Sequence, residues 1–174
     1  MLEIPSYFTR LYTAAEIDRR VDEIAAQITE DFEGRTVHLV GVLRGANIFL
    51  SDLVRRIEVP LSYDFLAVSS YSGTSSTGVV RLIKDLDESI ESEHVIVVED
   101  IIDSGLTLNY ILEQLQNRKP ASVHVCAFLD RPHNRKAALK IDYTGFAIPD
   151  KFVVGYGLDF EQKWRQLPDI WAIN

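Results

Sequence analysis

The sequence contains one local unit twice: a short run of β-branched and apolar residues, a tight polar turn, and an amphipathic helix. In residues 35–57 the unit reads RTVHLVGVL, RG, ANIFLSDLVRRI, and in residues 94–117 it reads HVIVVED, IIDSG, LTLNYILEQLQN. A strand that is apolar throughout is buried on both of its faces, and a helix after each strand returns the chain to lay the next strand parallel to it. The repeat therefore predicts an α/β fold, a doubly wound and mainly parallel sheet with helices on both faces.

The rest of the chain fits the same scheme. Thr13 and Glu16 stand at the capping-box spacing ahead of a helical apolar stripe, so we expect a helix over residues 13–31. LSYDFLAVSS and VVRLI read as two strands joined by a polar loop, and SVHVCAFLD reads as a further buried strand before a basic loop, RPHNRK. With 174 residues, 47% of them hydrophobic, we expect residues 1–174 to form a single domain.

The charge balance argues against two classes of partner. A net charge of −8 disfavours a nucleic-acid or anionic-membrane binder, and no apolar run approaches the length that crosses a bilayer. Cys126 is the only cysteine, which excludes an intrachain disulfide and any thiolate metal cluster. We expect a soluble, cytoplasmic protein without a targeting segment.

Two nucleotide-binding motifs fail on inspection. Gly73 and Gly78 have the spacing of a phosphate-binding loop, but Val79 and Val80 stand where that loop needs Lys and Ser or Thr. The GYG at residues 155–157 begins like a dinucleotide fingerprint but lies too near the end of the chain to open a strand–helix–strand unit. The four histidines show no metal-ligand spacing, and we expect structural roles for them.

The turn that follows HVIVV carries chemistry. Glu99, Asp100 and Asp103 precede a Ser-Gly-x-Thr turn at the start of a helix, where backbone N–H groups can converge on a phosphate. Glu99 and Asp100 can accept hydrogen bonds from a sugar diol or hold a hydrated Mg²⁺. The alternative is that the acidic residues only favour a helix N-terminus and that Ser104 is its N-cap. Two charges at the tip of a buried strand favour the ligand-binding interpretation, because burying them is costly without compensation.

VIVVEDIIDSGLTL resembles the phosphoribosyl-diphosphate (PRPP) signature of the type I phosphoribosyltransferases. GVLRGANIF, SSYSGTSSTG and IKDLD resemble further blocks of that family in the same order, and the tail IPDKFVVGYGLD is similar to its hypoxanthine-guanine branch, which acts on 6-oxopurines. The resemblance covers nearly the whole chain and implies a small hood built from N- and C-terminal segments. It also implies the reaction: PRPP and hypoxanthine or guanine give the purine nucleoside monophosphate (IMP or GMP) and pyrophosphate, with Mg²⁺ as cofactor.

The resemblance implies roles for particular residues. The segment expected to hold the ribose and its 5′-phosphate comprises Glu99, Asp100, Ile101, Ile102, Asp103, Ser104, Gly105, Leu106 and Thr107. Asp103 is expected to be the general base or proton carrier near the purine N7. The metal is expected at Glu99, Asp100 and Asp159. Pyrophosphate is expected at Arg44, Gly45 and Arg165, with a cis peptide between Leu43 and Arg44.

The purine is expected to contact four residues: Arg131, Phe152, Val153 and Asp159. Phe152 would stack on the base and the Val153 backbone would read its edge, while Ser70 and Tyr71 begin an expected lid. Arg131 departs from the family, which usually has Lys at this position; a guanidinium is longer and planar, so the preferred purine stays open.

Each of these residues also has a plainer interpretation. Phe152 is read as a core residue of a short strand, Arg165 as a surface helix residue, Arg131 as a solvated loop cation, and the polar loop as a linker. The function has alternatives too: an enzyme that prefers xanthine or guanine, a nucleotide-sensing RNA-binding regulator with the same fold, and a carboxylate–Mg²⁺ phosphohydrolase. We further expect a homo-oligomer, a dimer or a tetramer.

Overall fold

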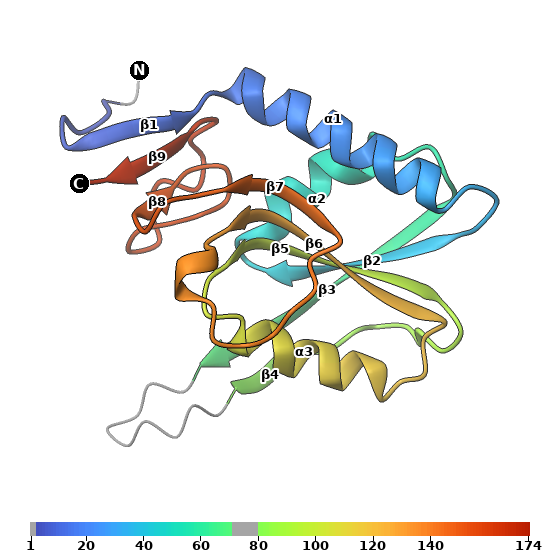
Figure 1. Cartoon of the computed structure of the whole chain (residues 1–174). Helices are drawn as coiled ribbons and strands as arrows, with labels where there is room; N and C mark the ends of the chain where they lie inside the picture. The colour runs from blue at the N-terminus through green and yellow to red at the C-terminus, as the bar shows by residue number, and fades with distance from the viewer. Residues whose placement is uncertain (1–2, 71–79) are drawn as a thin grey trace.

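The computed structural model describes residues 3–70 and 80–174 and contains two sheets, one of six strands and one of three (Figure 1). The elements in chain order are β1 (Phe8–Tyr12), α1 (Ala14–Asp31), β2 (Val37–Leu43), α2 (Ala46–Val54), β3 (Leu61–Ser70), β4 (Val80–Lys84), β5 (His94–Ile102), α3 (Leu106–Gln116), β6 (Ser122–Asp130), the 3₁₀ turn η1 (Pro132–Asn134), β7 (Tyr143–Ala147), β8 (Phe152–Val154) and β9 (Ile170–Ile173).

The large sheet has the strand order β4-β3-β2-β5-β6-β7. Every neighbouring pair is parallel except β3 and β4, which are antiparallel. The two strand–turn–helix units found in the sequence supply β2 with α2 and β5 with α3. The predicted doubly wound, mainly parallel sheet is confirmed, and β4 is the returning strand expected from VVRLI.

Helices cover both faces of this sheet (Figure 1). Successive side chains of the central strands point to opposite faces of the sheet and pack in two separate cores. Leu39 and Ile96 pack with α1 and α2, whereas Val40 and Val97 pack with α3. Strands with apolar side chains on both faces are the reason that HVIVV and HLVGV are almost uninterrupted apolar runs.

The capping box predicted from Thr13 and Glu16 is present. Thr13 Oγ1 accepts from the Glu16 N–H at 3.3 Å, and Glu16 Oε2 accepts from the Thr13 N–H at 2.8 Å. Helix α2 ends at Val54, earlier than the sequence pattern indicates. The carbonyl of Leu53 accepts from both Arg56 and Ile57, which closes the last turn before the chain reverses toward β3.

The small sheet forms the expected hood. Its order is β1-β9-β8, all antiparallel, so a strand from the start of the chain pairs with two strands from its end. Figure 1 shows both termini on this side of the molecule. The segment between β8 and β9, residues 155–169, meets the large sheet where Gly157 packs on Gly45, and Arg165 Nη1 donates to the Gly157 carbonyl within the segment. Across the described residues, none of the helices combines the length and the apolar character needed to cross a bilayer.

Candidate active site

A cleft of about 250 Å³ lies where the carboxyl ends of β5 and β6 face the hood. Ligands of doubly wound folds bind at this edge of the sheet. The cleft brings together residues from three separate segments of the chain, and its lining residues are Asp100, Ile101, Asp103, Arg131, Phe152, Val153, Leu158 and Asp159. Seven of these eight residues, all but Leu158, carry roles expected from the sequence.

Two adjacent carboxylates end the buried part of β5. Glu99 is 7% exposed, and burial raises its pKa well above the ordinary range. Burial also raises the pKa of Asp100 to about 6, and the nearby charge of Asp159 adds to that rise while Arg165 opposes it. Within residues 3–70 and 80–174 neither Glu99 nor Asp100 takes part in an ion pair. A bound cation would therefore be stabilised here, because the protein offsets the desolvation cost only in part, through Arg165 and the Ile101 N–H that Asp100 Oδ1 accepts from at 2.8 Å.

The turn after β2 packs directly against the tip of β5. A Cβ atom on Gly45 would lie 1.5 Å from Asp100 Oδ2, and a Cβ atom on Gly157 would lie 2.2 Å from the Gly45 carbonyl oxygen. Only glycine fits at either position without displacing a neighbour. The Leu43–Arg44 peptide is cis, as the resemblance implied. The expected pyrophosphate loop, the acidic strand end and the hood segment are thus in mutual contact.

The turn into α3 has the form of an anion site. Gly105 is the N-cap of α3 with φ of 78° and has no side chain to cap the helix, while Ser104 Oγ, one residue earlier, accepts from the Leu106 N–H at 3.4 Å. Ser104 is therefore not the N-cap residue itself, although its hydroxyl accepts from the first N–H of the helix. The Ser104 carbonyl accepts from the backbone N–H groups of Lys136 and Ala137, so the loop after β6 holds this turn in position. The first N–H groups of a helix have no acceptor within the helix, and together they form the positive end of its dipole. This turn can bind a phosphate.

Arg131 is held inside the cleft rather than in solvent. Its side chain is 11% exposed, Nη2 donates to the Lys151 carbonyl at 2.5 Å, and Nη1 lies 3.6 Å from Asp103 Oδ1. The interpretation of Arg131 as a solvated loop cation is wrong. Asp103 is half exposed, with 51% of its side chain accessible, and its carboxylate faces the cleft.

Phe152 does not pack into the core. It is 52% exposed and meets Phe160 edge-on at a centroid distance of 5.6 Å, whereas Val153 beside it is buried. An exposed ring on the wall of a cleft offers a face on which a flat base can stack. The interpretation of Phe152 as a core residue is therefore wrong.

Arg165 lies in an irregular segment between β8 and β9, so it is not the surface helix residue that its neighbours suggested. Nη1 donates to the Gly157 carbonyl at 2.7 Å, and Nη2 pairs with Asp159 Oδ1 at 2.6 Å. Arg44 is exposed and contacts the same segment through Gln162. Sequence reasoning missed Gln162 and Leu158, because nothing in their local sequence marks them as part of a site.

The expected Mg²⁺ ligands are only partly gathered. In the part of the chain that the structure describes, His, Cys, Asp and Glu side chains nowhere form a group of three or more placed to hold a metal ion. Asp100 and Asp159 line the cleft, but Glu99 does not. The expected trio is therefore not a ready-made site. Two carboxylates in a cleft nevertheless fit Mg²⁺, which is usually held by one or two carboxylates together with substrate oxygens.

The expected lid lies almost wholly outside the described residues. Ser70 is the last residue of β3, and Tyr71 falls outside the described ranges.

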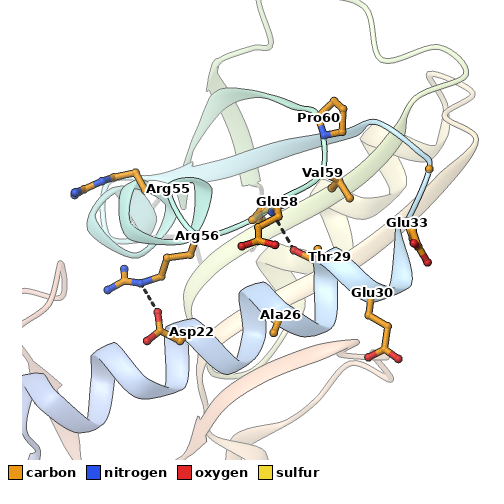
Figure 2. Close-up of a pocket in the computed structure, with 12 residues that line it drawn as sticks. Asp22, Ala26, Thr29, Glu30, Glu33, Arg55, Arg56, Glu58, Val59 and Pro60 are labelled. Carbon is orange, nitrogen blue, oxygen red and sulfur yellow. Dashed lines mark hydrogen bonds and ion pairs between the residues drawn. The ribbon is translucent and has the colours of Figure 1, made fainter.

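A larger groove of about 920 Å³ lies at the opposite edge of the sheet, between α1 and the connection from α2 to β3. Figure 2 shows two interactions across this groove: Arg56 pairs with Asp22 at 2.6 Å, and the Glu58 N–H donates to Thr29 Oγ1 at 3.0 Å. Arg56 also pairs with Asp18. Since it contains none of the expected site residues, we do not assign the function to this groove.

Comparison with known proteins adds three findings. A family model described as a phosphoribosyl transferase domain matches residues 8–161. The hypoxanthine-guanine phosphoribosyltransferase of Staphylococcus aureus is 48% identical over 165 residues, which cover 94% of this chain and 92% of that protein. The enzyme of the same name from Bacillus subtilis is 45% identical over the same shares. Among solved structures, a hypoxanthine-guanine phosphoribosyltransferase from Bacillus anthracis is 42% identical and superposes with a TM-score of 0.91, covering 99% of this chain and all of that chain.

Proposed function

The chain belongs to the phosphoribosyltransferase family, and it matches hypoxanthine-guanine phosphoribosyltransferases over nearly their whole length. We therefore propose that it is a purine-salvage enzyme. It transfers the 5-phosphoribosyl group of PRPP to hypoxanthine or guanine and forms IMP or GMP and pyrophosphate. The observation that carries this proposal is the cleft itself. It places an acid, a hydrogen-bond donor and an exposed aromatic ring, Asp103, Arg131 and Phe152, beside the acidic tip of β5.

The turn from Asp103 to Thr107 is proposed to bind the 5′-phosphate. The first turn of α3 supplies N–H groups, and the hydroxyls of Ser104 and Thr107 can add donors. Asp100 then lies beside the ribose, where its carboxylate can accept hydrogen bonds from the ribose hydroxyls; we propose the same role for Glu99, together with the backbone of Ile101, Ile102 and Leu106. This arrangement holds the sugar by both ends, and it fixes the anomeric carbon toward the open part of the cleft.

The departing pyrophosphate is proposed to lie against Arg44, Gly45 and Arg165. Breaking the bond between C1′ and the diphosphate oxygen leaves positive character on the ribose and negative charge on the leaving group. Guanidinium groups fixed near that charge stabilise it as it develops. Asp100 and Asp159, with Glu99 behind them, would hold Mg²⁺, which when bound supplies further charge to the diphosphate.

The purine is proposed to lie on the exposed face of Phe152, with its edge against the Val153 backbone. Arg131 points into the same space and can donate to the 6-oxo group. Asp103 can take the proton from N7 as N9 attacks the anomeric carbon, as a general base does. A donor-only guanidinium at this position favours a 6-oxo group over a 6-amino group. A 6-amino group would place its own N–H against the Arg131 N–H, and neither donor would have an acceptor.

A steady-state assay with PRPP, Mg²⁺ and each of hypoxanthine, guanine, xanthine and adenine tests this function. We expect IMP or GMP and pyrophosphate in equal amounts, and no AMP. Release of inorganic phosphate in place of pyrophosphate would point to a phosphohydrolase, and would contradict the proposal.

We also propose that residues 1–174 form one domain and that the enzyme is a cytoplasmic homo-oligomer, a dimer or a tetramer. The buried free thiol of Cys126 is compatible with a reducing compartment. The exposed side chains of Tyr63 and Ile83, on the adjacent strands β3 and β4, offer apolar area to a second copy. Light scattering coupled to gel filtration gives the mass of the assembly.

A further inference from the structure

A single side-chain oxygen joins the two arginines that we assign to the pyrophosphate. Arg44 Nη1 donates to Gln162 Oε1 at 3.2 Å, and Arg165 Nη2 donates to the same oxygen at 3.4 Å. Arg44 follows β2, whereas Arg165 lies in the hood segment between β8 and β9. Gln162 therefore connects the two halves of the proposed diphosphate site, which the chain brings together only after folding.

The position of Gln162 is itself fixed by contacts that surround it. Its backbone N–H donates to Asp159 Oδ2 at 2.8 Å, and the other oxygen of that carboxylate pairs with Arg165 Nη2 at 2.6 Å. Phe160 and Lys163 exchange two backbone hydrogen bonds across the same turn, at 3.1 and 3.0 Å. These bonds fix the backbone of Gln162, from which Oε1 reaches both guanidinium groups.

Two guanidinium groups that face one anion repel each other, and long side chains lose rotamer freedom when they are ordered. A shared acceptor reduces both costs before substrate arrives, because it orients the two groups in advance. We infer that Gln162 is a positioning residue for the diphosphate: its Oε1 holds Arg44 and Arg165 together so that both can contact the leaving pyrophosphate. The inference rests on the proposed function, because that function is what assigns the two arginines to pyrophosphate.

The test separates the acceptor from the bulk of the side chain. Gln162→Met keeps the length of the side chain but removes the amide oxygen that accepts from both arginines. Gln166→Ala is the matched control, since Gln166 is an exposed glutamine in the same segment. The measurements are the KM for PRPP, the KM for the base, kcat, and the Kd of Mg²⁺-pyrophosphate from titration calorimetry.

We expect Gln162→Met to raise the KM for PRPP and the Kd of pyrophosphate by roughly five- to tenfold, the loss typical of exposed charge-assisted hydrogen bonds. The KM for the base stays within about twofold, because the base is placed by Phe152 and Arg131. Gln166→Ala behaves as wild type in every constant. Gln162 has φ of 63°, a conformation that Asn tolerates better than Met. If the Met variant does not fold, Gln162→Asn replaces it, since it is too short to reach either arginine and should weaken pyrophosphate to the same degree.

Unchanged pyrophosphate affinity in Gln162→Met, or an equal rise in the KM values for PRPP and base, would overturn the inference. The first result would mean that the arginines need no shared acceptor, and the second that the hood is damaged as a whole. A wild-type enzyme that forms no nucleotide from PRPP and a 6-oxopurine would instead refute the proposed function. The two failures are therefore distinguishable in one set of assays.

Discussion

Replacing Gly45 by alanine tests whether the turn after β2 and the tip of β5 form one rigid site. The new Cβ atom would lie 1.5 Å from Asp100 Oδ2, whereas ordinary contact begins near 3.4 Å, so the carboxylate or the turn must move by about 2 Å. A misplacement of about 1 Å can cost roughly 10²-fold in rate. We therefore expect kcat/KM for PRPP to fall by at least about 10²-fold. Overpacking of this kind costs about 1–3 kcal/mol of stability, so the protein should still fold, with a Tm lowered by several degrees.

Gly34→Ala is the matched control. Gly34 has a positive φ, 73°, unlike Gly45 with φ of −64°, and nothing lies within 4 Å of its expected Cβ position. This variant strains the backbone but introduces no clash, and it should lose about 1 kcal/mol of stability with kcat/KM unchanged. Steady-state kinetics and thermal unfolding of both variants separate an effect on the site from an effect on stability. A Gly45→Ala enzyme that keeps kcat/KM within threefold of the wild type would refute the packing argument.

Three further predictions follow from the cleft. Asp103→Asn should lower kcat by roughly 10²–10⁴-fold with little change in the KM for PRPP, as loss of a general base does, and unchanged turnover would remove that role. The pKa of Asp100 is raised to about 6 in the fold, so its ionisation destabilises the folded state increasingly as the pH rises from about 4 to 6. Urea unfolding should therefore find Asp100→Asn more stable than the wild type at pH 7 and without that advantage at pH 4. Equal differences in unfolding free energy at both pH values would contradict the raised pKa. Phe152→Ala should raise the KM for the base by roughly ten- to 100-fold through lost stacking, while the KM for PRPP stays within about threefold; a rise in the PRPP value alone would place the base elsewhere.

Local patterns were sufficient to predict most of the fold. The capping box at Thr13 and Glu16 needs only residues three apart, and the apolar runs of β2 and β5 show burial on two faces without reference to the rest of the chain. The end of α2 was less predictable. The apolar spacing continues to Ile57, but the helix stops at Val54 because the chain must reverse into β3.

The site was predictable where its residues are contiguous and less so where packing assembles it. The acidic turn after β5 could be read as a phosphate site from its own residues. The exposure of Phe152 and the burial of Arg131 depend on how the hood meets the sheet, and local sequence favoured the opposite for Phe152. Gln162 gave no signal at all, because its contacts join residues far apart in the chain.

A crystal structure of the enzyme with IMP and Mg²⁺-pyrophosphate tests the central claim most directly. The account predicts the 5′-phosphate on the N–H groups of residues 103–107, the purine on the face of Phe152 with its 6-oxo group near Arg131, and the pyrophosphate between Arg44 and Arg165. A nucleotide bound in the groove between α1 and the α2–β3 connection, with the cleft at the end of β5 empty, would contradict it.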